Sequence, residues 1–366
     1  MRVEPVGASM ALIFVLVLAE STELHGCEIV AGRGLTPHVH AVHDNLISRR
    51  RFIGTVAAAA ALPVVLRAAS GFDDIPIIDT HIHLFDGTRP QGAPYKGGRG
   101  FAGGVALPAM FAKIARPLGI VGALEIDASP WVEDNLWVLE TIQPTPFMVG
   151  TVGNLQPEKP EFAAYLERFA KNPLFRGIRY GNNWGYNIAV QAENPAFIAG
   201  LRLLAQAGLV LDTANPRIDL LQAVIKISDQ LPDLRIVIDH LPSFDPTPQN
   251  QADYNALLKE IAPRRQIYVK LSEIVHPVRP AGTLTRGLAA HRDRLDTLMG
   301  CFGEDRVLFG SDWPNCVGVS EVPDTVALVR EYFSTKPRAA AEKYFWKNSV
   351  AAYRWTPRET GQPGVV

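Results

Sequence analysis

Short apolar runs alternate with amphipathic stretches along the chain from residue 76 onward. Brief runs rich in Ile, Val and Leu are typical of buried parallel strands, and apolar residues spaced three and four apart are typical of helices. The pattern predicts strands at 76–78, 121–126, 147–152, 175–178, 209–211, 235–238, 267–271 and 306–309. It predicts helices between them, among others at 131–141, 161–171, 195–207, 218–230, 252–261 and 291–301.

The alternation of strands and helices indicates parallel strands joined by helical crossovers. Eight such units make a closed (β/α)8 barrel, the TIM-barrel fold of the α/β class, which typically needs about 250 residues. Residues 71–366 suffice for one barrel, and neither a solenoid repeat nor a low-complexity linker interrupts them. We therefore expect a single TIM barrel over 71–366, with its chemistry at the carboxyl ends of the strands.

A different pattern precedes the predicted barrel. Ser48-Arg49-Arg50-Arg51 is followed by an alanine-rich apolar run that ends near Leu66, with small residues after it. Paired arginines before such a run are typical of a twin-arginine export signal, and the run falls short of the roughly twenty apolar residues that span a membrane. We expect residues 1–70 to be a leader with its signal at 48–70, and residues 1–47 to reflect an over-extended start of translation. The expected destination is the periplasm, reached through the twin-arginine (Tat) machinery.

Charge and cysteine content narrow the classes of function. The formal net charge of −1 gives no electrostatic argument for binding nucleic acid or an anionic membrane surface. Beyond the leader only Cys301 and Cys316 remain, so the chain has no disulfide framework. Cys301 ends the helix before the last strand and Cys316 follows that strand, so we expect them at opposite ends of the barrel as free thiols.

Two histidines follow the first predicted strand at a spacing of two. Side chains two apart on a strand project to the same side, so His81 and His83 would reach one metal ion or one substrate group together. His38 and His40 share the spacing, but they lie in the leader with no strand before them. Polar residues follow the other strands as well: Glu125, Asp127, Ser129, Asn154, Arg179, Trp184, Asp212, Asp239, His240, Lys270, Ser272, Glu273 and Asp312.

Three segments at the ends of predicted strands together resemble the amidohydrolase superfamily. They are Asp79-Thr-His-Ile-His83 on the first strand, Ile238-Asp-His240 on the sixth and Phe309-Gly-Ser-Asp312-Trp-Pro on the eighth. Segments 125–135, 173–179, 231–240 and 269–272 resemble in particular the branch that holds sugar lactonases and 2-pyrone-4,6-dicarboxylate lactonase. The resemblance extends over residues 75–355 and implies a hydrolase on a TIM barrel.

The chain departs from the two-metal members of this superfamily at two positions. Those members carry a bridging lysine or glutamate on the fourth strand and a histidine on the fifth, where this chain has Arg179 and Asp212. An arginine keeps its proton and cannot bridge metals. The resemblance then implies one divalent ion, zinc or manganese, held by His81, His83 and Asp312, with His240 completing the shell or facing the substrate. Some relatives in the branch need no tightly held metal, which leaves open whether the ion is required.

Hydrolysis of a lactone or ester needs a base for water, a cation or donor for the developing oxyanion and an acid for the leaving oxygen. We expect Asp312 to be the base, and the ion or the histidines, His240 included, to act on the carbonyl oxygen. Arg179 suits a substrate carboxylate, and the other expected substrate ligands are Lys270, Trp184 and Ser129. Structural alternatives remain: Asp312 as a helix cap, His240 as a core histidine, Arg179 as an ion-pair partner of Glu125 or Asp212, and Lys270 as a rim lysine.

The leading hypothesis is therefore hydrolysis of a carboxylic ester, above all a lactone, with a small lactone or carboxylate as the partner molecule. The second is metal-dependent, non-oxidative decarboxylation of an aromatic or enol acid, which relatives also perform. Asp212 in the place of a strand-five histidine argues against the second. A non-catalytic binding protein that kept the fold would not need His81, His83, His240 and Asp312 together.

Overall fold

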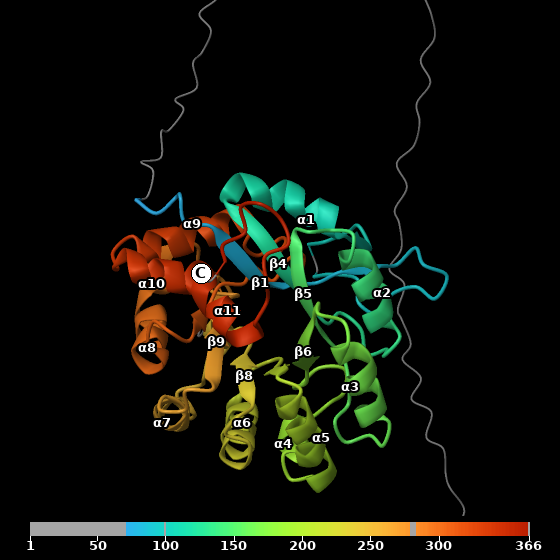
Figure 1. The fold of residues 1–366 in the computed structure, drawn as a ribbon. Coiled ribbons are helices and arrows are strands. Elements are labelled where there is room, and N and C mark those ends of the chain that lie inside the picture. Colours follow the sequence, from blue (N-terminus) through green and yellow to red (C-terminus); the bar gives the residue numbers. More distant parts are fainter. Residues whose placement is uncertain (1–70, 99, 279–282, 365–366) are drawn as a thin grey trace, which may run out of the picture. The chain divides into compact units, whose positions relative to one another are not determined.

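A computed structural model describes residues 71–98, 100–278 and 283–364, and the statements that follow concern these residues. Eight parallel strands lie side by side in the order β1-β4-β5-β6-β7-β8-β9-β12. In Figure 1 the sequence colours pass in order around the ring of elements, and the red C-terminal helices return to the side of the blue strand β1. The strands are β1 Ile77–Ile82, β4 Ile120–Ile126, β5 Met148–Gly153, β6 Phe175–Arg179, β7 Val210–Asp212, β8 Arg235–Ile238, β9 Ile267–Lys270 and β12 Val307–Leu308.

All eight predicted strands are present, which confirms the TIM barrel, but β1 runs further than the prediction of 76–78. The prediction ended this strand at its first polar residue, Asp79. Asp79 and Thr80 are fully buried, and Oδ1 of Asp79 accepts the backbone N–H groups of His81 and Ser311, each at 3.0 Å. These two bonds engage one oxygen of the buried carboxylate and tie it to the backbone on both sides, and the strand continues through polar residues to Ile82.

The barrel is closed between its first and last strands by backbone hydrogen bonds rather than by a long ladder. The N–H of Thr80 donates to the carbonyl of Phe309 at 3.0 Å, and the N–H of Asp312 donates to the carbonyl of His81 at 2.9 Å. The N–H of His83 donates to the carbonyl of Trp313 at 2.8 Å. These contacts hold the segment after β12 directly against the end of β1.

The helices form the outer layer, as their apolar faces require. Asn194 caps the N-terminus of α5 by accepting the N–H of Ala196 at 3.0 Å, and Pro195 occupies the first turn, where a missing N–H costs nothing. The α-helices are α1 Pro108–Ala115, α2 Asp134–Ile142, α3 Phe162–Ala170, α4 Ile188–Gln191, α5 Pro195–Gln206, α6 Ile218–Gln230, α7 Gln251–Ile261, α8 Arg292–Phe302, α9 Val322–Phe333, α10 Arg338–Glu342 and α11 Asn348–Tyr353. Short helices of other types are η1 Arg116–Leu118, η2 Leu241–Ser243, η3 Leu288–Ala290 and the π-helix η4 Lys343–Lys347.

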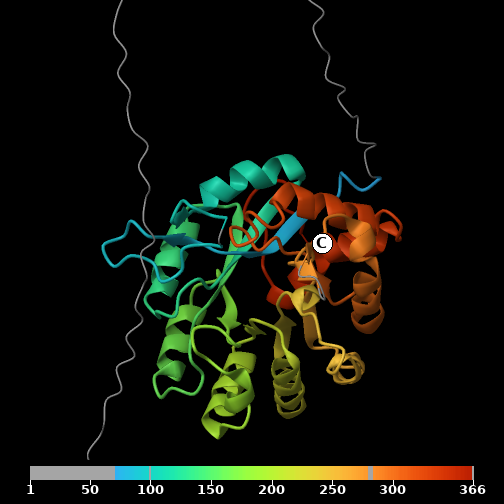
Figure 2. The same ribbon diagram turned by 180° about the vertical axis from the view of Figure 1, so that it is seen from behind.

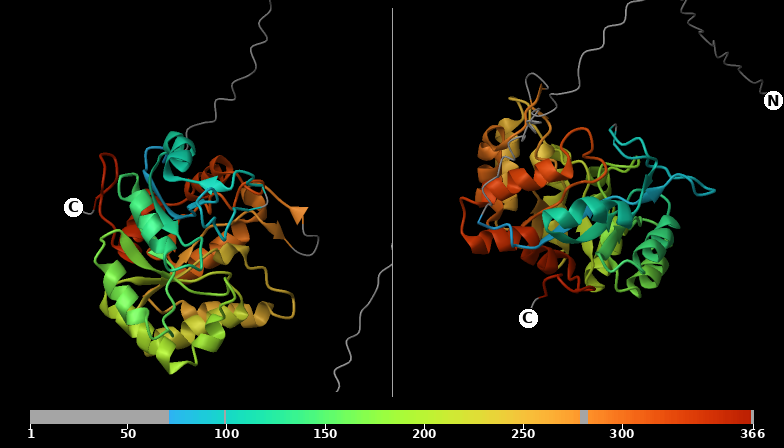
Figure 3. Two further views of the ribbon diagram at one scale, coloured as in Figure 1. Left: turned by 90° about the vertical axis from the view of Figure 1, so that its right-hand side faces the viewer. Right: turned by 90° about the horizontal axis from the view of Figure 1, so that it is seen from above.

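Two short hairpins lie outside the barrel. β2 (Phe85–Asp86) pairs with β3 (Val105–Ala106), and the loop between them extends beyond α2 (Figure 2). Arg89 of this loop pairs with Asp134 of α2 at 2.8 Å. The second hairpin, β10 (Pro277–Val278) with β11 (Thr283–Leu284), projects from the body in the left view of Figure 3.

Membrane-spanning helices, the two cysteines and the leader can also be compared with the structure. Within the described residues, no helix has both the length and the apolar character needed to cross a membrane. Cys301 and Cys316 are free thiols, as predicted. The expected leader, with its twin-arginine signal, lies outside the described residues.

Candidate functional site

Four side chains from three strand ends meet inside the mouth of the barrel. Oδ1 of Asp312 lies 3.1 Å from Nε2 of His83, 3.5 Å from Nε2 of His81 and 3.7 Å from Nε2 of His240. All four residues are buried. The strand ends therefore bring together the set that the sequence predicted.

The histidine rings are oriented by bonds on their far sides. Nδ1 of His83 lies 2.8 Å from the carbonyl oxygen of Ile126, which turns Nε2 toward Asp312. Nδ1 of His240 lies 2.8 Å from the hydroxyl of Ser272, with the same result for its Nε2. Burial lowers the pKa of all three histidines, that of His83 to about 4, so the rings are neutral at neutral pH.

Asp312 sits in a left-handed backbone conformation with φ 62°, at the sharp turn after β12. Its Oδ2 accepts a hydrogen bond from Nδ2 of Asn315 at 2.7 Å, which leaves Oδ1 facing the histidines. Burial raises the pKa of Asp312 to about 6, while hydrogen bonds from Glu273 and Asn315 and the charge of Arg179 oppose the rise. The helix-cap alternative is wrong, because the next helix, α9, begins at Val322 with Glu321 at its N-cap.

A cavity of about 330 Å³ opens above these groups. His83, His240, Asp312 and Arg179 line it from the barrel, together with Trp184 and Tyr95. Tyr95 comes from the loop between β2 and β3, and its hydroxyl donates to Oδ1 of Asn315 at 2.9 Å. This loop, which follows the first strand, thus contributes a wall of the cavity.

Arg179 lies at the end of β6 and faces this cavity. Its Nε donates to Oδ2 of Asp239 at 3.0 Å, and its Nη1 lies 3.7 Å from Oδ1 of Asp127. Burial acts to lower the pKa of Arg179, but the charges of Asp239 and Asp127 outweigh it and the pKa is raised. Arg179 therefore stays charged, and its ion-pair partners differ from the Glu125 and Asp212 that the sequence suggested.

Lys270 does not lie at the rim and does not line the cavity, which corrects the sequence-based expectation. It is fully buried, with Nζ 2.6 Å from Oδ2 of Asp212, 2.9 Å from Oδ1 of Asp239 and 3.2 Å from Nδ1 of His81. Asp212 also accepts from the hydroxyl of Tyr353 at 2.9 Å. The long side chain of Lys270 thus pairs with two carboxylates beneath His81, and Arg179 supplies a second positive charge to Asp239.

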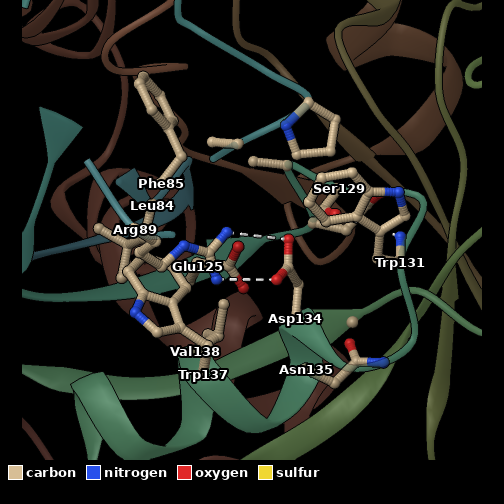
Figure 4. Close-up of a pocket in the computed structure, with 15 residues that line it drawn as sticks. Leu84, Phe85, Arg89, Glu125, Ser129, Trp131, Asp134, Asn135, Trp137 and Val138 are labelled. Carbon is tan, nitrogen blue, oxygen red and sulfur yellow. Dashed lines mark hydrogen bonds and ion pairs between the residues drawn. The ribbon is translucent and has the colours of Figure 1, made fainter. Parts of the chain in front are cut away.

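Ser129 also lies away from the cavity. Its hydroxyl accepts the backbone N–H of Trp131 at 3.1 Å, a local turn contact. It lines a separate space of about 20 Å³ beside Glu125 and the Arg89–Asp134 pair, drawn in Figure 4. That space holds about one water molecule, so a role for Ser129 in substrate binding is not supported by its position.

The donor set of the site fits one divalent ion. Nδ1 of His83 faces a carbonyl oxygen, which only accepts, so Nδ1 carries the hydrogen and Nε2 presents a lone pair. That lone pair and Oδ1 of Asp312 are two acceptors 3.1 Å apart, an arrangement that calls for a shared cation or proton. Ligand atoms of His81, His83 and Asp312 lie within 4.8 Å of one another, and within the described part of the chain Nε2 of His81 has no hydrogen-bond partner. Arg179 and Lys270 pair with the carboxylates of Asp239 and Asp212, which makes those oxygens less available to a second ion.

Sequence reasoning did not single out two residues that shape the site, Asn315 and Tyr95. Asn315 lies three residues after Asp312 in a loop, and no pattern marks its amide as a partner of the carboxylate. Tyr95 lies in the Gly- and Pro-rich segment after the first strand. Its distance of more than two hundred residues from Asn315 gives no local signal of their contact.

The comparisons with known proteins agree with this geometry. The family model described as amidohydrolase matches residues 78–355. An L-fucono-1,5-lactonase of Burkholderia multivorans (strain ATCC 17616 / 249) is 24% identical over 295 residues, which cover 75% of this chain and 94% of the relative. The lactonase similarity is in line with the branch that the sequence segments indicated.

Solved structures share the fold. An amidohydrolase from Burkholderia multivorans with bound Zn aligns with a TM-score of 0.66 at 21% identity, over 76% of this chain and 99% of that chain. A 5-carboxyvanillate decarboxylase from Sphingomonas paucimobilis aligns with a TM-score of 0.54 at 14% identity, over 77% of this chain and 100% of that chain. At these identities the likeness shows the common barrel.

Proposed function

Because the chain belongs to the amidohydrolase family, we propose that it hydrolyses a lactone or a related carboxylic ester, with Asp312 as the base. The observation that carries the proposal is the position of Oδ1 of Asp312, which faces the Nε2 atoms of three neutral histidines beside a cavity that Asp312, His83 and His240 line. A base beside groups that bind a carbonyl oxygen is what ester hydrolysis requires. The similarity to an L-fucono-1,5-lactonase supports a lactone as the ester.

In the proposed reaction, each proton is taken up and returned by a residue of this chain. Asp312, oriented by Asn315, takes a proton from water as the water oxygen attacks the carbonyl carbon of the ester. The bond from that carbon to the ring oxygen then breaks, and Asp312 returns the proton to the leaving oxygen, which yields a hydroxy acid. A divalent ion bound at His83 and Asp312, next to His81, would polarise the carbonyl group and lower the pKa of a water molecule. His240 lies beside the same space, where it can contact the substrate oxygen.

The cavity suggests a small, polar substrate. Its volume of about 330 Å³ is at the low end of the range for small-molecule sites. Arg179 presents a permanent positive charge at its wall, and Trp184 is held there by the bond from its Nε1 to Oδ2 of Asp127 at 2.8 Å. A monocyclic lactone that carries a carboxylate or several hydroxyl groups would meet the arginine and the indole ring.

The competing proposal is metal-dependent decarboxylation, because a solved decarboxylase shares the fold. A strand-five histidine available to the metal would favour it, but this chain has Asp212 there. Both oxygens of Asp212 are engaged by Lys270 and Tyr353. Asp212 is thus committed to buried partners, and the geometry favours ester hydrolysis.

A substrate panel separates the two reactions. Sugar 1,5-lactones, a carboxylated monocyclic lactone, aryl esters and aromatic carboxylic acids are incubated with metal-stripped, zinc-loaded and manganese-loaded protein. Acid release and carbon dioxide are both measured. We expect acid release from lactones that disappears in Asp312→Asn. Carbon dioxide without ester cleavage would replace our proposal by decarboxylation, and a panel with no ester turnover under any metal condition would overturn it.

A further inference from the structure

The two histidines of the first strand have different neighbours behind their rings. Nδ1 of His83 lies 2.8 Å from a backbone carbonyl oxygen, that of Ile126. Nδ1 of His81 lies 3.2 Å from Nζ of Lys270 and 3.6 Å from Oδ1 of Asp239. One ring therefore faces a group that only accepts hydrogen bonds, and the other faces first of all a group that only donates them.

This difference decides which nitrogen of each ring carries the hydrogen. A neutral imidazole has one N–H and one lone pair, and the bond that one nitrogen makes fixes the state of the other. The carbonyl behind His83 places its hydrogen on Nδ1 and leaves a lone pair on Nε2, the form of a metal ligand. The ammonium behind His81 needs a lone pair on Nδ1, which places the hydrogen on Nε2, where it cannot bind a metal.

The position of Lys270 is strongly constrained. Its side chain is fully buried, its Nζ donates a hydrogen bond to Oδ2 of Asp212 at 2.6 Å, and it forms an ion pair with Oδ1 of Asp239 at 2.9 Å. A second N–H group of the ammonium is available for Nδ1 of His81, which lies 3.2 Å from Nζ. Because the two carboxylates hold the ammonium in place, the contact with His81 is built into the barrel floor rather than made by a mobile side chain.

We propose that in the metal-free protein Lys270 is a positioning residue that keeps His81 with its hydrogen on Nε2, so that Nε2 is a hydrogen-bond donor on the side of Asp312 and offers no lone pair to a metal ion. A metal ion gains His81 only if the hydrogen moves to Nδ1 and Asp239 replaces Lys270 as its partner. His83 and Asp312 need no such change, so the ion is held by an incomplete set and exchanges readily. The tautomer and the metal affinity do not rest on the proposed function.

The tautomer can be measured directly on the full chain. The protein is labelled with ¹⁵N in its histidine rings and stripped of metal, and ring correlations in NMR spectra report which nitrogen carries the hydrogen. His81→Asn identifies the signals of His81. We expect His81 to carry its hydrogen on Nε2 and His83 on Nδ1. Hydrogen on Nδ1 of His81 in the wild-type protein overturns the proposal, and this measurement requires no change at Lys270.

Zinc affinity gives a second, independent readout. Lys270→Met combined with Asp212→Asn removes one positive and one negative charge together, and the amide introduced at position 212 can still accept from Tyr353, so the buried charge balance is preserved. Competition with a chromophoric zinc chelator should show tighter zinc binding, by about 10- to 100-fold, the usual range for a partner behind a metal-binding histidine. Lys259→Met, which removes an exposed lysine of α7, is the matched control and should leave zinc affinity unchanged.

The outcomes are distinct from those of the substrate panel. Unchanged or weaker zinc binding in a folded double variant would overturn the proposal, whatever the panel shows. If the double variant does not fold, as judged by circular dichroism, the wild-type NMR spectrum alone decides. Absence of lactone turnover would remove the proposed function and leave the tautomer and zinc results unaffected.

Discussion

Nδ2 of Asn315 donates to Oδ2 of Asp312 at 2.7 Å, while Oδ1 of the same carboxylate lies 3.1 Å from Nε2 of His83. One oxygen is thus used to orient the group and the other faces the site. A helix cap would instead direct the carboxylate at backbone N–H groups of a first turn. This geometry supports the proposed role of Asp312 as the base.

Asp312→Asn should abolish most activity while the fold survives. Asparagine keeps the size of aspartate but cannot take a proton, and general acid–base assistance is typically worth about 10²- to 10⁴-fold. Turnover should fall by at least this range with a near-native melting temperature. Asp253→Asn, an exposed substitution in α7, should change neither quantity. Nearly full activity in Asp312→Asn would contradict the proposed mechanism.

Arg179→Lys should raise KM for carboxylate-bearing substrates more than it lowers kcat. Lysine keeps a positive charge near Asp239 but cannot form a bidentate hydrogen-bonded pair with a carboxylate. Loss of one hydrogen bond to a charged group costs about 1.5–3 kcal/mol, which is about 10- to 100-fold in KM. The control is a neutral lactone of the same ring size, for which KM should change little. Equal effects on both substrates would assign Arg179 a purely structural role.

Glu125→Gln should stabilise the protein at neutral pH. Burial raises the pKa of Glu125 well above its ordinary value of 4.5, although the hydrogen bond from Thr151 opposes the rise. The folded protein therefore keeps this proton at pH values where the unfolded chain has lost it. Stability falls as pH rises from about 4.5 toward the folded pKa, by up to about 1.4 kcal/mol per pH unit. Glutamine is uncharged in both the folded and the unfolded protein, so the variant does not lose this stability as pH rises.

The measurement is denaturant unfolding of wild type and Glu125→Gln from pH 5 to about 8, above the ordinary pKa of a glutamate, where the unfolded chain has lost the proton. The difference in unfolding free energy should grow in favour of the variant as pH rises. Glu140→Gln, an exposed change in α2, is the matched comparison for the loss of one carboxylate at the surface. A pH-independent difference for Glu125→Gln would show that Glu125 is ionised in the folded protein.

Export through the twin-arginine machinery stays a prediction. Replacing Arg49 and Arg50 by lysine should leave the precursor in the cytoplasm, because the paired arginines are the recognised feature. Cell fractionation with antibody detection gives the distribution, and the mature protein should begin near residue 70. Unchanged export of the lysine variant would assign location to another segment or to no signal at all.

The barrel could be predicted because each strand is a local apolar run followed by a polar residue. The same logic placed His81, His83, His240 and Asp312 at one end, since all parallel strands end on the same side. A charged residue within a buried strand, such as Lys270, shows that partners must exist. The sequence does not show that its long side chain reaches two carboxylates on neighbouring strands.

Ser129 was misplaced for a related reason. Its position after β4 suggested the cavity, but the chain turns immediately and Ser129 bonds to Trp131 instead. Position along the sequence predicts which end of the barrel a residue occupies. The direction of a side chain in the following loop depends on contacts between segments far apart in the chain, such as that of Tyr95 with Asn315.

The closure of the barrel determines at which stage of folding the active site can form. The backbone of Asp312 donates to that of His81, a residue 231 positions earlier, so the proposed base meets its histidines only when the first and last strands join. A nascent chain that lacks the segment after β12 has neither the backbone hydrogen bonds that close the barrel nor the proposed base. Catalytic competence should therefore appear in a single late step of folding, together with protease resistance of the first strand, and no shortened chain that ends before this segment should retain partial activity.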